Sequence, residues 1–127
     1  MIYLDTSVAL AQLLGETRVP PPSLWEGSLV SSRLLEYELW TQIHSRKLGA
    51  SHGDAARALL AEVSFVELTP HVLARTLEPF PVAVRTLDAL HLASMEFLRA
   101  HDRSLRIASY DARLLRAVRA LELRIFE

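Results

Sequence analysis

Residues 1–15 read MIYLDTSVALAQLLG, and this stretch indicates the fold class of the chain. Ile2–Leu4 is a short run with β propensity that ends at Asp5. The apolar spacing after it predicts a helix over Thr6–Leu14, which Gly15 would end as a residue tolerant of left-handed backbone. The start of the chain therefore predicts a strand that leads directly into a helix.

The same alternation of strand and helix continues to the end of the chain. Because strands separated by helices pair largely in parallel, the pattern predicts a three-layer α/β/α sandwich. Its sheet would have four to five mostly parallel strands, with helices on both faces. We expect Ser51 to cap the third helix. The further predicted strands are 29–31, 65–68, 106–109 and 123–126, and the further helices are 32–48, 51–61, 70–78, 86–100 and 111–121.

Length and composition fit one domain over residues 1–127, since the chain has no internal repeat and no long linker. A hydrophobic fraction of 50% and a mean hydropathy of +0.18 predict a well-filled interior and apolar surface that a partner could cover. The N-terminus has no positive region before its apolar stretch and carries a carboxylate within it. We therefore expect neither a signal peptide nor a membrane span, and a cytoplasmic protein.

The absence of cysteine and the net charge limit the kinds of site that the chain can form. The absence of cysteine excludes disulfides, thiolate metal sites and cysteine nucleophiles. The net charge of −1 does not by itself predict nucleic-acid binding. The segment from Arg99 to Arg124 is basic, but a solvated helix face explains such a segment more often than a nucleic-acid site does.

Four acidic residues lie where this topology would bring them to one edge of the sheet. Asp5 and Asp111 follow strands, Glu38 lies early in the helix after the second strand, and Asp88 lies in the first turn of the helix over 86–100. Ligands of open parallel sheets bind at the carboxyl ends of the strands. Because clustered carboxylates repel unless a cation binds them, the sequence predicts one Mg²⁺ or Mn²⁺ site for phosphodiester hydrolysis.

Each acid also has an ordinary structural explanation. Asp5 and Asp111 could simply cap helices, and Glu38 could be a surface residue, with Glu36 only two residues away. Asp88 differs because its helical neighbours are apolar or aromatic, so its charge needs a partner such as backbone N–H groups, a cation or an arginine.

One turn after Asp88 lies His91, which we expect to be a buried, hydrogen-bonded histidine and not a ligand. The chain has no paired histidine motif of the kind that binds zinc.

Four segments, in order, resemble the PIN-domain family and its VapC-type toxin branch. The most specific is LDALHLA at 87–93, and the others are IYLDTS at 2–7, Ser31-Ser32 followed by Glu38-Leu39, and SYDARL at 109–114. The resemblance implies a metal-dependent endoribonuclease, the toxin of a type II toxin–antitoxin pair. Its catalytic and metal-binding quartet would be Asp5, Glu38, Asp88 and Asp111.

The resemblance implies several further features. It selects Glu38 over Glu36, because the family glutamate lies about six residues after the serine that ends the second strand. It suggests that the hydroxyls of Thr6 and Ser109 support the acidic cluster. It also implies a homodimer and a VapB-type antitoxin that covers the acidic cleft. At Glu122 the family usually has glycine, which leaves the last turn in question.

An RNA substrate would also need cations, since an acidic cleft alone repels phosphates. The candidates, chosen by nearness in sequence to the quartet, are Arg33, Arg85, Arg113 and Arg116.

Two other functions remain open. A phosphoacceptor or a phosphatase could use Asp5. A phosphoacceptor would need a lysine late in the chain, but the only lysine is Lys47. A phosphatase would need an aspartate at position 7, where the chain has Ser7. A non-catalytic PIN-like interaction module is the other alternative, although all four acids are retained.

Overall fold

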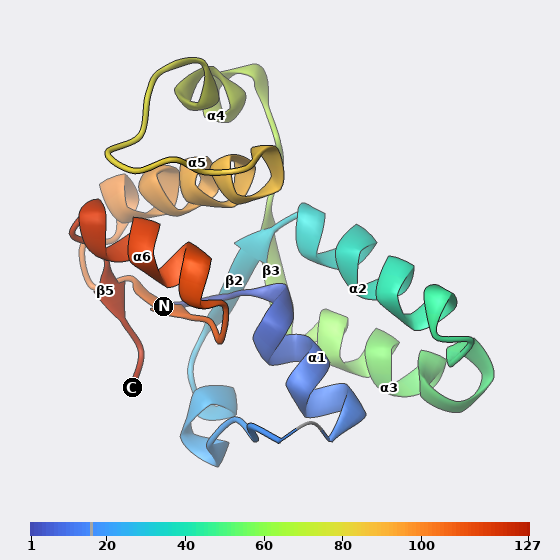
Figure 1. Ribbon diagram of the computed structural model, residues 1–127. Coiled ribbons are helices and arrows are strands. Elements are labelled where there is room, and N and C mark those ends of the chain that lie inside the picture. The colour runs from blue at the N-terminus through green and yellow to red at the C-terminus, as the bar shows by residue number, and fades with distance from the viewer. Residues whose placement is uncertain (16) are drawn as a thin grey trace.

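The computed structural model describes residues 1–15 and 17–127. Within these residues, a parallel sheet of five strands lies between two layers of helices (Figure 1). The predicted α/β/α sandwich is therefore confirmed. The strands are β1 Ile2–Leu4, β2 Leu29–Ser32, β3 Val63–Val66, β4 Arg106–Ala108 and β5 Arg124–Ile125. The helices are α1 Thr6–Leu14, α2 Leu34–Ser45, α3 Gly49–Ala61, α4 Pro70–Ala74, α5 Thr86–His101 and α6 Ala112–Ala120, with 3₁₀ turns η1 Pro22–Glu26 and η2 Arg75–Leu77.

The strand order, β3-β2-β1-β4-β5, places a topological switch point between β1 and β4. From β1 the chain moves outward to β2 and β3, and α5 then carries it back to the other side of β1. Leu4 pairs with Ala108, and the Asp5 N–H donates to the Ala108 carbonyl at 3.0 Å. The residues that follow these two strands therefore meet where ligands bind in open parallel sheets.

Both faces of the sheet are buried, as the alternation of side chains along β1 requires. Ile2 and Leu4 pack in one core with α1, α2 and α3, whereas Tyr3 packs in a second core with α5 and α6. Figure 1 shows these two groups of helices on opposite sides of the sheet. None of the described helices is long and apolar enough to span a membrane.

Two predicted elements have different boundaries in the structure. The third helix begins at Gly49, and Ser51 lies inside its first turn, where its hydroxyl donates to the Leu48 carbonyl at 3.3 Å. The chain turns directly from α2 into α3 through Lys47, whose φ is 56°, so no polar cap is used. The third strand starts at Val63 and ends before Glu67, because its pairing with β2 sets its limits. The other boundaries shift by a few residues, and η1 was not predicted.

The turn after α6 forms in spite of its glutamate. Glu122 adopts φ 58°, with its N–H donating to the Arg119 carbonyl and the Leu123 N–H donating to the Val118 carbonyl, both at 3.0 Å. This pair of bonds is a Schellman motif, in which glycine is preferred because a Cβ is strained in left-handed backbone.

Glu122→Gly should therefore stabilise the protein by about 0.5–1 kcal/mol, since relief of the strain exceeds the entropy that glycine adds to the unfolded chain. Urea unfolding measures the difference as a higher midpoint. Glu122→Ala is the matched control, because it removes the same charge but keeps a Cβ. An equal gain in both variants would assign the effect to charge and contradict the strain.

Candidate metal centre

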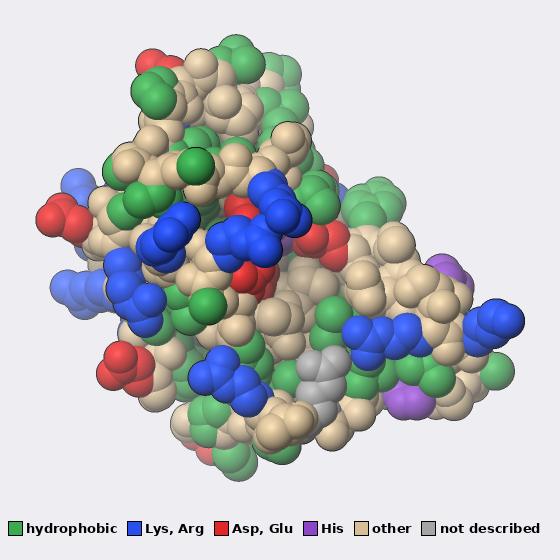
Figure 2. All heavy atoms as spheres, viewed as in Figure 1, with side chains coloured by type: hydrophobic (Ala, Val, Ile, Leu, Met, Phe, Trp, Pro, Cys, Tyr) green, Lys and Arg blue, Asp and Glu red, His purple; other side chains and the backbone are tan. Residues whose placement is uncertain are grey.

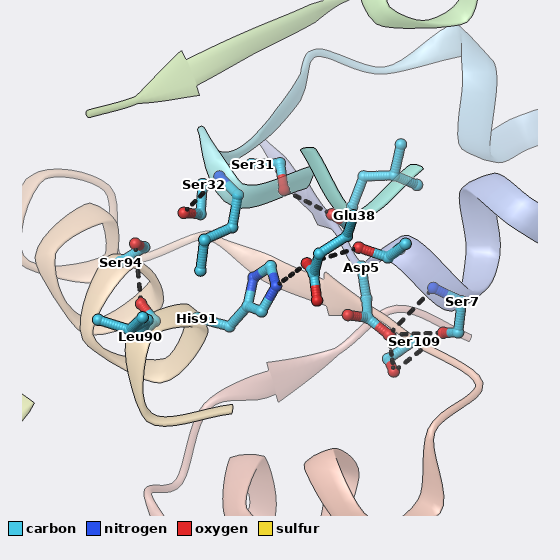
Figure 3. Close-up of polar contacts among 12 residues, drawn as sticks. Asp5, Ser7, Ser31, Ser32, Glu38, Leu90, His91, Ser94 and Ser109 are labelled. Carbon is cyan, nitrogen blue, oxygen red and sulfur yellow. Dashed lines mark hydrogen bonds and ion pairs between the residues drawn. The ribbon is translucent and has the colours of Figure 1, made fainter. Parts of the chain in front are cut away.

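Asp5 lies at the switch point with 5% of its surface exposed. Its Oδ2 accepts hydrogen bonds from Ser7 Oγ at 2.5 Å and from Ser109 Oγ at 2.8 Å, and a longer one from the Ser7 N–H at 3.4 Å (Figure 3). No donor among the described residues reaches its Oδ1. Asp5 is thus the N-cap of α1, as its ordinary explanation required, and one of its oxygens is left for another ligand.

Two serines tie the ends of β1 and β4 together around Asp5. Ser7 Oγ accepts the Tyr110 N–H at 2.9 Å, and Ser109 Oγ accepts the Asp111 N–H at 3.0 Å. Ser109 therefore lies where the sequence placed a supporting hydroxyl. Ser7 was missed, although a serine two residues after a capping aspartate is a recognisable signal for a local side-chain bond.

Glu38 reaches the same region from α2. Its Oε1 accepts hydrogen bonds from Thr6 Oγ1 at 2.9 Å and from His91 Nε2 at 2.6 Å, and no described residue donates to its Oε2. Glu36 instead lies beside Arg33, with 3.7 Å between their charged atoms. The structure therefore brings Glu38, and not Glu36, to the acidic cluster, and it places Thr6 as a supporting hydroxyl.

His91 is the buried, hydrogen-bonded histidine that the sequence predicted, but it also orients Glu38. Its Nδ1 lies 2.7 Å from Tyr3 Oη, which accepts the Ser32 N–H at 3.2 Å. Burial raises the pKa of Tyr3 far above its usual value, so its O–H stays intact and donates to Nδ1. The imidazole hydrogen is then on Nε2, where it donates to Glu38.

His91 and Glu38 each shift the pKa of the other. Burial opposes the charged form of His91, but the hydrogen bond and charge of Glu38 outweigh it and raise the pKa of His91. Burial likewise opposes ionisation of Glu38, but the hydrogen bonds and charge of His91, with Thr6, lower the pKa of Glu38. Glu38 is therefore an oriented carboxylate at neutral pH.

Asp111 is the N-cap of α6, and its Oδ1 accepts the N–H groups of Arg113 at 2.9 Å and Leu114 at 3.2 Å. No described residue donates to its Oδ2. Capping and ligand binding are therefore compatible for Asp111, as they are for Asp5, because each role uses a different oxygen.

Asp88, in the first turn of α5, receives no hydrogen bond from the described residues. The arginine partner considered for it is not formed within this part of the chain, since no ion pair joins Asp88 to Arg85. Burial, followed by the negative charges of Asp111 and Asp5, raises the pKa of Asp88. Asp88 is therefore close enough to Asp111 and Asp5 for their negative charges to disfavour its ionised form.

Asp88→Asn should raise the thermal midpoint of the metal-free protein at pH 7. A raised carboxyl pKa means that the fold favours the neutral form, so the ionised carboxylate destabilises the fold above that pKa. The gain should shrink as the pH falls through the raised pKa toward the ordinary value of 3.8. Circular dichroism melts in EDTA measure it, with Asp54→Asn, an exposed acid on α3, as the control. A lower midpoint for Asp88→Asn at pH 7 would contradict the repulsion.

The acids line a pocket of about 450 Å³ with cations at its edge. Glu38, Asp88 and Asp111 contribute acidic side chains, and Arg85 and Arg113 contribute basic ones. Figure 2 shows acidic side chains gathered in a hollow, with Lys and Arg side chains beside it. Two of the four predicted arginines therefore reach the site.

The other two predicted arginines lie elsewhere. Arg33 is engaged by Glu67, with 2.6 Å between Nη2 and Oε2, and lies over the Phe65 ring. Arg116 is exposed on α6 and does not line the acidic pocket. Nearness in sequence to the quartet was therefore an incomplete guide to nearness in space.

The donor set suits a hard divalent cation. Among the described residues, no three acidic or histidine side chains already surround one ion position. Three of the four carboxylates nevertheless have one oxygen held by protein donors and the other without one. Mg²⁺ keeps several waters and needs only one or two direct carboxylates. The oxygen-only set of Asp5, Glu38, Asp88 and Asp111 therefore fits a hydrated Mg²⁺ or Mn²⁺.

The chain matches a known protein family over a range that includes this whole site. The family model described as PIN domain matches residues 2–120, which include all four acids. No curated protein matches the chain.

Proposed function

The chain belongs to the PIN domain family, whose members are typically metal-dependent nucleases, and on this premise we propose that it is an Mg²⁺- or Mn²⁺-dependent endoribonuclease. Its catalytic quartet would be Asp5, Glu38, Asp88 and Asp111. One observation carries the proposal: at the switch point of the sheet, Asp5, Glu38 and Asp111 each have one oxygen held by the protein and one without a protein donor.

The residues of the chain would divide the work of hydrolysis. Ser7 and Ser109 orient Asp5, and His91 orients Glu38, so these carboxylates need no reorganisation when the substrate arrives. Arg85 and Arg113 would bind phosphates at the edge of the pocket and offset the repulsion between the acids and RNA. When bound, the divalent ion supplies polarisation of the phosphodiester and stabilisation of the negative charge of the transition state.

Binding of Mn²⁺ tests the metal site directly. Isothermal titration should show binding to the wild-type protein and none to an Asp5→Asn, Asp88→Asn double variant. Glu36→Gln is the matched control, because Glu36 lies on the same helix as Glu38 but pairs with Arg33, and it should bind as the wild type does. Equal binding by the double variant would overturn the metal site.

We further propose that residues 1–127 act as a single PIN-like domain, as the VapC-type toxin of a type II toxin–antitoxin pair, with a homodimeric state and a VapB-type antitoxin as partner. The resemblance of LDALHLA at 87–93 supports this role. Large apolar side chains exposed on the described surface, among them Leu77 at 87% and Tyr37 at 62%, offer contact area for such partners.

Expression of the chain alone and together with its neighbouring open reading frame tests the toxin role. Growth arrest that the neighbour relieves would support a toxin and its antitoxin. If the protein cleaves RNA in vitro but growth continues under both conditions, the nuclease activity would stand and the toxin role would be rejected.

A further inference from the structure

A second pocket lies near the acidic one, although the two have no lining residue in common. It has a volume of about 570 Å³ and is lined by Ser7, Leu10, Ala11, Thr17, Arg18, Arg46 and Tyr110. Ser7, which lines this second pocket, contacts the acidic cluster through Asp5: its hydroxyl donates to Asp5 Oδ2 at 2.5 Å and accepts the Tyr110 N–H at 2.9 Å. The next residue after Tyr110 is Asp111, which lines the acidic pocket. A molecule in the second pocket would therefore lie close to Asp5 and Asp111.

The second pocket combines an aromatic ring with a cation. The Arg18 guanidinium lies 4.8 Å from the centroid of the half-buried Tyr110 ring. Ser7 holds the Tyr110 backbone, so the position of the ring is tied to that of Asp5. Sites for single-stranded nucleic acid combine these features, because every base has a face that can stack and every phosphate carries charge.

The two pockets give the acidic centre a basic flank on each side. Arg85 and Arg113 line the acidic pocket, whereas Arg18 and Arg46 line the second one. Figure 2 shows Lys and Arg side chains on two sides of the central acidic side chains. A nucleic-acid strand that crosses the acids would thus meet cations before and after the phosphate that is cleaved.

We infer that the second pocket binds one unpaired nucleotide of the RNA, next to the phosphate that the acids hydrolyse, with its base against the Tyr110 ring and the Arg18 guanidinium. This inference rests on the proposed ribonuclease function. The base must be unpaired, because a base within a duplex stacks on its neighbours and cannot also stack on Tyr110. The pocket would therefore favour cleavage in single-stranded segments or loops.

Binding of a labelled single-stranded RNA oligonucleotide, followed by fluorescence anisotropy in EDTA at low salt, tests this inference without any cleavage. Tyr110→Ala should weaken binding by roughly 5- to 100-fold, as expected for the loss of one stacked base. Tyr110→Phe keeps the ring and should bind within about twofold of the wild type. Arg18→Ala, a change at an exposed residue, should also weaken binding.

Arg57→Ala is the matched control. Arg57 lies over the Trp40 ring at 5.3 Å, a similar cation and ring pair that lines neither pocket, and its loss should leave binding unchanged. A perfect duplex should show no dependence on Tyr110. Tyr110→Ala should still bind Mn²⁺ as the wild type does, which separates this pocket from the metal site.

The outcomes separate this inference from the proposed function. Binding of RNA by the wild type with no loss in Tyr110→Ala or Arg18→Ala would overturn the nucleotide pocket alone. No binding of single-stranded RNA by the wild type would also overturn the nucleotide pocket, whereas the proposed ribonuclease function is decided separately by the Mn²⁺ titration and the cleavage assay. Equal losses in Arg57→Ala and Arg18→Ala would assign the effect to net charge and also overturn the pocket.

Discussion

Asp5→Asn should reduce RNA cleavage by at least about 10², because an amide cannot replace both oxygens of this carboxylate. Oδ2 accepts hydrogen bonds from Ser7 and Ser109, and Oδ1 has no donor among the described residues. If the amide oxygen keeps the two serines, the NH₂ group points toward the cation. If the amide turns over, the NH₂ group faces the hydroxyls of Ser7 and Ser109, which donate to Oδ2 in the wild type and would have to accept instead. Either orientation lowers the affinity for a divalent ion.

The single-turnover rate at saturating Mn²⁺ and RNA measures this loss apart from substrate affinity. Asp54→Asn is the matched control, since Asp54 is an exposed aspartate on α3 that pairs with Arg57. It should cleave as the wild type does. A circular dichroism melt should show that Asp5→Asn is folded. Cleavage by folded Asp5→Asn at the wild-type rate would remove Asp5 from the mechanism.

Removal of divalent ions should abolish cleavage altogether, and Mg²⁺ or Mn²⁺ should restore it. Without a cation the acids only repel the phosphodiester, and burial, followed by the charges of Asp111 and Asp5, already raises the pKa of Asp88. The protein should stay folded in EDTA, because its two cores are independent of the acids. Mn²⁺ at about 100 times its dissociation constant should then stabilise the fold by about 2.7 kcal/mol.

Cleavage assays and thermal melts on the same samples distinguish the two effects. EDTA should remove activity and lower the midpoint, and added Mn²⁺ should reverse both in the wild type but not in Asp5→Asn. Undiminished cleavage in EDTA by protein whose midpoint does respond to Mn²⁺ would mean that the ion is structural and that another group performs the hydrolysis.

The order of strands and helices followed from local patterns. Local signals mark where elements begin and end: the apolar run before Asp5, the glycine at position 15 and the proline after Thr69. The structure has a helix cap or a helix end at each of these places. Ser51 shows the limit of such reasoning. A good capping residue lies near the start of a helix, but the preceding turn through Lys47 leaves it no group to cap.

Asp5 and Asp111 could be chosen from sequence because each follows a strand, and Asp88 because its helical neighbours are apolar, whereas Glu38 was chosen over Glu36 only through the family resemblance. Their supporting groups were harder to find. Ser7 was missed although it is close to Asp5 in sequence, and the role of His91 was missed because it depends on Tyr3, which lies 88 residues away. Arg18 and Tyr110 have no sequence pattern that joins them, since only the packing of two loops brings them together.

The sequence by itself determined the α/β class and the place of Asp5 and Asp111 at the carboxyl edge of a parallel sheet, because hydrophobic spacing and chain order are local properties. The tertiary structure decided which oxygen of each acid is held and which has no protein donor. Those choices rest on hydrogen bonds such as Ser109 to Asp5, across 104 residues, and His91 to Glu38, across 53. Such bonds depend on the register of β1 against β4 and on the positions of α2 and α5 on opposite faces of the sheet, which no local pattern specifies.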